Sequence, residues 1–299
     1  MTTSTTPTMS LPMGIVRALR PRQWIKNVLV FAAPVAAGIF DSSDSVIRSL
    51  IAFVCFCGAS SATYLVNDSL DVESDRRHPT KRNRPIAAGV VPVGLAWALA
   101  VVLFVVSVAG AFALRRDFGF TIVAYLVNTT LYTLWLKRQP ILDIVSVAAG
   151  FVLRAIGGAT ATDLPISEWF FIVTSFGALF MVAGKRAGEL HELGGDAARV
   201  RPVLATYSPE FLTYLRAVFS TGVLVTYCLW AFASADESPP GAVWFELSIV
   251  PFAIAILRYA LLLQQGRGSE PETLVLSDAT LLVSGALWAI IYGCAVYAT

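Results

Sequence analysis

Nine long apolar runs constrain this chain more than any other feature of its sequence. Most are close to the roughly 20 residues that an α-helix needs to cross the hydrocarbon core of a bilayer. Hydrophobic residues make up 56% of the 299 and charged residues only 14%, which excludes an ordinary soluble globular domain. Because the runs are far longer than the strands of a membrane barrel, the expected fold is an all-α, polytopic membrane bundle of about nine transmembrane helices. The runs cover residues 25–40, 46–66, 90–114, 118–136, 140–160, 168–184, 211–234, 242–265 and 278–298.

We expect a single transmembrane domain, residues 14–299, after a disordered N-terminal tail, residues 1–13. The tail is rich in Ser, Thr and Pro and has no charged side chain. The first apolar run is short and interrupted by Pro34, so we expect it to extend back through the basic segment that begins at Gly14. All four cysteines fall within expected spans, which argues against a zinc site and against a disulfide framework.

The basic residues predict the orientation of the bundle. Sixteen Lys and Arg residues lie on one expected side, near the N-terminus and around the loops after the second, fourth, sixth and eighth runs, whereas the other side has only Arg48, Arg115 and Arg116. The positive-inside rule therefore predicts a multi-pass protein of the cell membrane with a cytoplasmic N-terminus. The net charge of +2 is too small to indicate a nucleic-acid partner.

A ladder of carboxylates follows the second run, in the stretch NDSLDVESDRRHPTKRNRP. Asp68, Asp71 and Asp75 are three and four residues apart, so a helix would place them on one stripe together with Asn67. Unpaired carboxylates on one stripe repel, and Mg²⁺, or alternatively Mn²⁺, would relieve that repulsion through oxygen ligands shared with substrate phosphates. We expect all four side chains to bind the metal and the three Asp residues to be catalytic.

A basic run continues directly from the ladder, and its side chains suit the phosphate oxygens that a metal would leave free. The alternative interpretation is a solvated charged loop whose cations only fix the topology. The expected phosphate donors are Arg76, His78, Lys81, Arg82 and Arg84, with Arg77 among the cations of the run.

A second polar loop follows the sixth run, on the same expected side of the membrane. Helical spacing would place Lys185, Glu189 and Glu192 on one stripe, with Arg186 alongside. This loop is more basic than the first, and Arg199 and Arg201 add to its capacity for phosphate. The two loops are therefore interpreted as halves of one site, although topology and helical Glu/Lys pairs would also explain the charges.

Further polar residues near the cytoplasmic ends complete the set of expected substrate contacts. Asp143 and Arg154 share a helix face eleven residues apart, where a network between helices is at least as well supported as a ligand role. Topology and an aromatic belt could account for part of the N-terminal segment RPRQWIKN. The additional candidates are Arg22, Lys26 and Asn27 in that segment, and Tyr132 and Lys137 at the end of the fourth run.

About nine spans with N-D-x-x-D-x-x-x-D after the second resemble the UbiA superfamily of intramembrane prenyltransferases, and the resemblance covers nearly the whole chain. Within it, RPRQWIKNVLVFAAP and RHPTKRNRPIAAG are most similar to a branch that joins phosphoribosyl pyrophosphate to decaprenyl phosphate for cell-wall arabinan. Aromatic prenyltransferases of the superfamily have a second Asp ladder. Here the corresponding loop reads KRAGELHELG, and its one Asp, Asp196, lies outside any ladder.

The resemblance implies a Mg²⁺-dependent phosphoribosyltransferase that acts on a polyprenyl phosphate at the bilayer, with Lys26, Lys185 and Arg186 as cationic donors. A UbiA-type aromatic prenyltransferase of quinone biosynthesis, using a prenyl diphosphate, is the alternative enzyme. A transporter or lipid flippase is the alternative from another class, but the ligand-type residues crowd one membrane face rather than the midplane. The sequence specifies neither the prenyl chain length nor the oligomeric state, and a homo-oligomer stays open.

Overall fold

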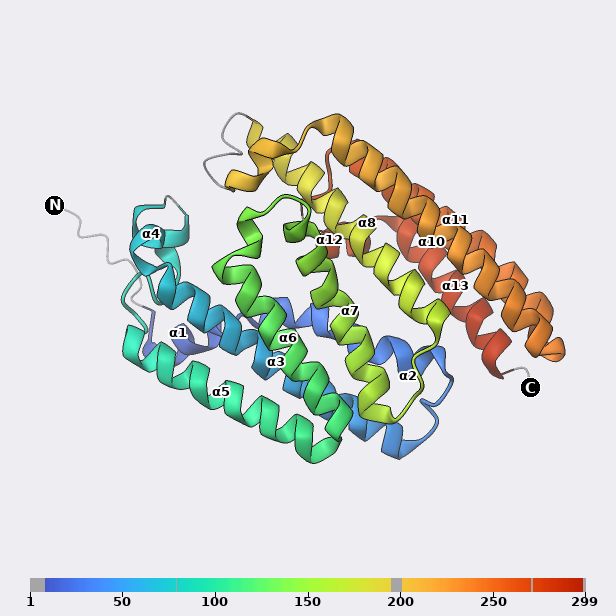
Figure 1. Cartoon of the computed structure of the whole chain (residues 1–299), viewed down its shortest axis with the longest axis horizontal. Helices are drawn as coiled ribbons and strands as arrows, with labels where there is room; N and C mark the ends of the chain where they lie inside the picture. Colours follow the sequence, from blue (N-terminus) through green and yellow to red (C-terminus); the bar gives the residue numbers. More distant parts are fainter. Residues whose placement is uncertain (1–8, 79, 195–200, 270, 298–299) are drawn as a thin grey trace.

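The computed structural model describes residues 9–78, 80–194, 201–269 and 271–297, and these residues form a bundle of helices with no strand among them (Figure 1). The predicted all-α membrane fold is confirmed, because seven of the described helices are long and apolar enough to cross a membrane. They are α3 (Ser43–Leu70), α5 (Val93–Leu114), α7 (Leu142–Thr162), α8 (Glu168–Leu193), α10 (Pro209–Glu237), α11 (Ala242–Gln264, preceded by the turn η6 at Pro239–Gly241) and α13 (Ala279–Tyr297).

Two of the nine expected spans differ from the other seven. Helix α6 (Arg116–Leu134) matches the run 118–136 and packs between α5 and α7, but polar residues keep its hydropathy below that of the others. The run 25–40 is not one α-helix. It forms a 3-10 helix, η1 (Pro21–Phe31), followed by the short helix α2 (Ala32–Ala36). Pro34 has no amide hydrogen to donate within a continuous α-helix, which fits the replacement of one long helix by two shorter elements.

The N-terminal segment is helical closer to the start of the chain than expected. Residues 1–8 of the expected tail lie outside the described residues, whereas Leu11–Met13 already belong to α1 (Leu11–Ala18). Ala18 packs in a core cluster with Leu65 and Ile86. The chain then turns at Arg20, whose φ of 55° is in the left-handed region, and η1 begins at the next residue. This turn directs Arg20 towards the end of α3.

Most consecutive long helices of the bundle lie beside one another. Helix α3 packs on α5, α5 on α6, α6 on α7, α7 on α8, α8 on α10 and α10 on α11. In Figure 1, α3, α5 and α6 form one side of the molecule and α10, α11 and α13 the other, with α7 between them. The last helix, α13, contacts α2, because the Tyr292 hydroxyl donates to the Ala36 carbonyl at 2.5 Å.

A glycine on α7, Gly158, allows η1 to lie directly against that helix. A Cβ atom at Gly158 would stand 1.8 Å from the Val30 carbonyl oxygen, a distance that no packing adjustment of a side chain could relieve. Gly158 is one turn beyond Arg154, which contacts Asn27 of η1. The glycine therefore fixes how deeply the polar segment around Lys26 and Asn27 enters the bundle.

Candidate active site

The carboxylate ladder keeps the helical spacing that the sequence predicts. Helix α3 ends at Leu70 and α4 (Val72–Arg77) begins two residues later, with Asp71 as the joint. The Asp71 amide donates to the Asn67 carbonyl at 3.0 Å and the Asp75 amide to the Asp71 carbonyl at 2.8 Å, so the i to i+4 ladder continues across the joint. Asp68 and Asp75 are buried, at 2% and 3% exposure.

Two arginines hold these buried carboxylates. Arg20 Nη2 donates to both oxygens of Asp68, at 2.7 and 2.8 Å. Arg84 Nη1 lies between the carboxylates, 3.0 Å from Asp68 Oδ1 and 2.7 Å from Asp75 Oδ2. Arg84, which we expected to contact phosphate, therefore neutralises the ladder. The sequence assigned Arg20 only to topology, since no spacing connects it to a residue 48 positions away.

The other two ladder side chains remain available for a ligand. Asn67 and Asp71 are half-buried and make no side-chain hydrogen bond or ion pair with any residue that the structure describes. Carboxylate and amide oxygens are the donors that Mg²⁺ prefers. Among the described residues no three His, Cys, Asp or Glu side chains converge closely enough to hold a metal alone. The donor set therefore fits a Mg²⁺ ion that takes the rest of its ligands from substrate.

In the basic run after the ladder, some side chains form hydrogen bonds within the loop and others have no such partner among the described residues. Arg76 Nε donates to the Ala87 carbonyl at 3.2 Å, and its Nη1 to Glu73 at 2.9 Å. His78 Nδ1 accepts from the backbone amide of Lys81 at 3.3 Å. These contacts shape the loop. Arg77, Lys81 and Arg82 make no side-chain contact of this kind within the described part of the chain, so they are the residues of the run free to meet an anion.

Arg186 is the centre of the second half of the site. It is 1% exposed, and its Nε donates to Asp143 Oδ2 at 2.7 Å while its Nη1 donates to Glu189 Oε2 at 2.8 Å. Glu189 lies 3.4 Å from Arg201 Nε as well. The structure thus places Arg186 and Glu189 in a network that positions neighbouring side chains. Glu192 instead accepts from the Ser269 hydroxyl at 2.5 Å, and Arg199 lies outside the described residues.

Two tyrosines extend this network. Tyr207 donates its hydroxyl proton to Asp143 and accepts from the Ile141 amide at 2.6 Å. Burial and the hydrogen bond to Asp143 raise the pKa of Tyr207, so the phenol stays neutral at physiological pH. The Tyr132 hydroxyl accepts from Arg201 Nη1 at 2.8 Å. Tyr207 was not predicted, because it lies 64 residues from Asp143 and outside every motif.

The two buried ions of α7 do not pair with one another. Asp143 binds Arg186 and Tyr207, as described above, whereas Arg154 contacts Asn27, Gly150 and Tyr125. A helix rise of about 1.5 Å per residue separates positions eleven apart by about 16 Å, which is too far for an ion pair. Asp143 and Arg154 therefore belong to two separate networks between helices, as one of the two interpretations of these residues expected.

A cationic pocket opens beside this network, with about 420 Å³ of empty space that is partly open to solvent. Its polar wall consists of Lys26, Tyr132, Lys185, Arg186 and Arg201, and the rest is mainly apolar. Four cations against the two carboxylates Asp143 and Glu189 leave the region positive. Expected contacts Arg22 and Lys137 are not part of this wall, and within the described chain their side chains have no hydrogen-bonding partner.

Segment 20–27 connects the ladder to the cationic pocket. Arg20 binds Asp68, and Lys26 lines the pocket. Six residues at the 2.0 Å rise of a 3-10 helix separate the two positions by roughly 12 Å along the backbone. The structure therefore supports the interpretation that the two polar loops serve one site.

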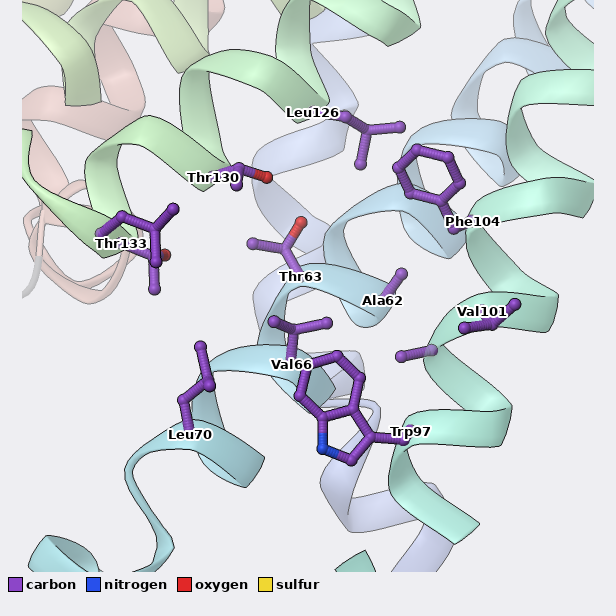
Figure 2. Close-up of a pocket in the computed structure, with 12 residues that line it drawn as sticks. Ala62, Thr63, Val66, Leu70, Trp97, Val101, Phe104, Leu126, Thr130 and Thr133 are labelled. Carbon is purple, nitrogen blue, oxygen red and sulfur yellow. The ribbon is translucent and has the colours of Figure 1, made fainter. Parts of the chain in front are cut away.

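An apolar groove lies between α3, α5 and α6, close to the end of the ladder helix (Figure 2). It encloses about 650 Å³ of empty space, and Val66, Leu70, Trp97 and Phe104 are among the side chains that line it. Leu70, immediately before Asp71, is 53% exposed. The groove can accommodate a hydrocarbon chain that enters from the bilayer.

Known proteins resemble this chain over nearly its whole length. The profile of the UbiA prenyltransferase family matches residues 28–282. A decaprenyl-phosphate phosphoribosyltransferase of Mycobacterium tuberculosis is 45% identical over 296 residues, 98% of this chain and 97% of the relative. The enzyme of the same name from Corynebacterium glutamicum is 44% identical over 298 residues, 97% of this chain and 89% of the relative.

Solved structures show the same fold. A UbiA homologue from Archaeoglobus fulgidus, bound to DMAPP and Mg²⁺, superposes with a TM-score of 0.72 at 17% sequence identity. The superposition covers 95% of this chain and 99% of the archaeal one. At this low identity, the likeness concerns the arrangement of the helices.

Proposed function

This chain belongs to the UbiA prenyltransferase family, and from that premise we propose that it transfers a 5-phosphoribosyl group from phosphoribosyl pyrophosphate to decaprenyl or another polyprenyl phosphate. The products are polyprenylphosphoryl-5-phosphoribose, a precursor for cell-wall arabinan, and pyrophosphate. In this proposal the protein is a multi-pass enzyme of the cell membrane whose site loops face the cytoplasm. Identity of about 45% to relatives that carry this activity in their names supports the proposal.

The cationic pocket is the observation that carries the choice of substrate. Lys26, Lys185 and Arg201 contribute three cations, and the buried Arg186 contributes a fourth. A neutral aromatic acceptor would need few of these charges, whereas a sugar with a 5-phosphate and a pyrophosphate needs several cationic donors. The pocket therefore favours phosphoribosyl pyrophosphate over the acceptor of an aromatic prenyltransferase.

We assign the metal to the ladder. Asn67 and Asp71 are open, and Asp68 and Asp75 would join them as Arg20 and Arg84 shift towards substrate oxygens. When bound, Mg²⁺ supplies charge stabilisation for the departing pyrophosphate. The archaeal relative whose structure contains Mg²⁺ has the same fold, which supports the use of a divalent cation here.

The chain's own residues then hold two anions in line for reaction. The bond between ribose C1 and the pyrophosphate oxygen breaks, its electron pair leaves with pyrophosphate, and an oxygen of the lipid phosphate forms the new bond to C1 from the opposite face. Because that oxygen is already anionic, no side chain needs to remove a proton. Lys185, Arg201 and Lys26 orient the phosphates, and this positioning is the main contribution of the pocket.

We place the polyprenyl chain in the apolar groove of Figure 2. The groove borders the last turn of α3, so a lipid lying there would bring its phosphate towards the start of the ladder. Thr63, Thr130 and Thr133 lie along the same wall but offer little charge, which suits an uncharged isoprenoid.

The substitution Asp71→Asn tests the metal assignment. Asp71 has no partner among the described residues, so the folded protein should tolerate the change, while phosphoribosyl transfer should fall by at least about 100-fold at millimolar Mg²⁺. Glu73→Gln is the matched control, because Glu73 lies on the same turn but is exposed and pairs only with Arg76. Near-normal turnover in Asp71→Asn would refute the assignment.

The same preparation separates the proposed reaction from its alternative. Product should form from phosphoribosyl pyrophosphate and a polyprenyl phosphate. Incorporation of prenyl label from a prenyl diphosphate into an aromatic acceptor, with no phosphoribosyl product, would instead identify an aromatic prenyltransferase.

A further inference from the structure

Arg154 is a buried cation without a described counter-ion. It is 7% exposed within α7, and its three hydrogen bonds go to neutral acceptors: Nε to Asn27 Oδ1 at 2.7 Å, Nη1 to the Gly150 carbonyl at 2.7 Å and Nη2 to the Tyr125 hydroxyl at 2.8 Å. The other deeply buried arginine, Arg186, has two carboxylate partners. Within the described residues, no carboxylate pairs with Arg154 inside the bundle.

Such a charge is costly in a membrane-spanning helix. An Arg at the centre of a span is unfavourable on insertion scales, and intramembrane ions normally face a partner or a water-filled cavity. Stacking reduces this cost, since the Arg154 guanidinium lies 4.7 Å from the Tyr125 ring centroid and 5.8 Å from that of Phe151. Stacking does not supply the negative charge that would neutralise it.

Unused donors converge around Arg154. A guanidinium has five N–H groups, and three are used, which leaves one on each terminal nitrogen without an acceptor among the described residues. The Tyr125 oxygen accepts from Arg154, so the hydroxyl proton of Tyr125 remains available. Asn27 is held in place because its amide nitrogen donates to Cys57 Sγ at 3.3 Å.

This cluster adjoins the cationic pocket. Val147 and Phe151 line the pocket and precede Arg154 by seven and three residues, which places all three on one face of α7. Lys26 lines the same pocket and directly precedes Asn27, whose side-chain oxygen accepts from Arg154 Nε. Phe151, whose ring lies against the Arg154 guanidinium, therefore connects the pocket wall to this cluster.

We propose that Arg154, Lys26 and Tyr125 form a metal-independent subsite for a phosphate monoester at the inner end of the cationic pocket. Two N–H groups on adjacent nitrogens match two oxygens of a phosphate, the Tyr125 hydroxyl reaches a third, and the Lys26 ammonium adds charge. The ladder carboxylates take no part. The inference rests on the proposed function to the extent that both substrates of that reaction end in such a group: the lipid phosphate and the 5-phosphate of the donor.

Binding in EDTA tests the subsite without turnover. The intact protein in detergent is titrated with farnesyl phosphate and with ribose 5-phosphate, with farnesol and ribose as the uncharged comparisons. At least one of the two phosphates should bind wild-type protein, and Arg154→Met should weaken that binding by about 10-fold or more, as expected for a lost charge-assisted contact. An effect on farnesyl phosphate identifies the acceptor, and an effect on ribose 5-phosphate identifies the donor.

Three further variants separate binding from folding. Tyr125→Phe removes only the hydroxyl and should weaken phosphate binding several-fold, Arg154→Lys should retain part of it, and Arg48→Met, which alters an exposed ion pair with Asp44, should leave it unchanged. A lower melting temperature in Arg154→Met with unaltered binding in Tyr125→Phe and Arg154→Lys would overturn the proposal. So would the failure of both phosphates to bind wild-type protein. Because the assay contains neither Mg²⁺ nor a complete substrate pair, a protein that binds phosphate but transfers no phosphoribosyl group would refute the proposed function alone.

Discussion

Replacing Asp143 by Asn should destabilise the protein more than any other change of one carboxylate to its amide. Asp143 is fully buried, and it accepts from Arg186 Nε at 2.7 Å and from the Tyr207 hydroxyl. The amide has the same shape but no charge, and its nitrogen would face one of these two donors. Arg186, at 1% exposure, would then keep only one of its two carboxylate partners, Glu189.

The magnitude follows from what remains around Arg186. Removing one partner of a buried ion pair costs about 3–5 kcal/mol. Glu189 still accepts from Arg186 Nη1 at 2.8 Å, so the lower end of that range applies, about 3 kcal/mol. The exposed pair of Asp44 and Arg48, 2.6 Å apart, provides a control in which Asp44→Asn should cost under about 1 kcal/mol.

Reversible unfolding in mixed detergent micelles measures these free energies. Arg186→Met combined with Asp143→Asn should recover part of the loss, giving a coupling energy of at least about 1.5 kcal/mol in a double-mutant cycle. A free energy of unfolding for Asp143→Asn within about 1 kcal/mol of wild type would refute the view that this ion network holds α7 and α8 together.

Three further changes test other parts of the structure. Gly158→Ala should cost about 3 kcal/mol or more in detergent unfolding, because its Cβ would stand 1.8 Å from the Val30 carbonyl oxygen; a neutral effect would contradict the close packing of η1 on α7. Thr130→Trp should obstruct the groove of Figure 2, so the KM for long-chain polyprenyl phosphates should rise at least several-fold while the KM for short-chain ones stays unchanged. Val102→Trp, on the membrane face of α5, is the control, and equal effects of the two variants would disfavour the groove as the lipid site. Burial and the Asp143 bond raise the pKa of Tyr207, so its contribution to stability is fully present below the unfolded value of 10.0 and is lost as the pH rises from there through the folded value. Tyr207→Phe should therefore flatten the alkaline loss of stability that begins near pH 10, and identical curves would argue against the Tyr207–Asp143 bond.

The periodicity of the sequence predicted the structural features that depend on residues close together within one helix. The spacing of Asp68, Asp71 and Asp75 placed them on one stripe, and the helix continues through the Asp71 joint as that spacing requires. The long apolar helices were predictable for the same reason, since a bilayer requires about 20 apolar residues in succession. The 3-10 helix from Pro21 to Phe31 was not, because its conformation depends on contact with α7 at Gly158.

Contacts between distant segments could not be read from the sequence. Arg20 lies 48 residues from Asp68, and Tyr207 lies 64 residues from Asp143, so no helical period links either pair. The cations of the two loops looked alike in sequence, yet Arg84 and Arg186 bind buried carboxylates whereas Arg82 has no such partner among the described residues. Charge pattern indicated the two loops as a candidate site, and only the tertiary structure shows which of their cations bind carboxylates.

Transfer of labelled ribose tests the central claim most directly. Purified protein is incubated with Mg²⁺, phosphoribosyl pyrophosphate labelled in the ribose, and a polyprenyl phosphate, with and without EDTA. The account predicts label in the lipid phase that requires both the metal and the lipid phosphate. Folded protein that leaves all label in the aqueous phase at saturating Mg²⁺ would contradict it.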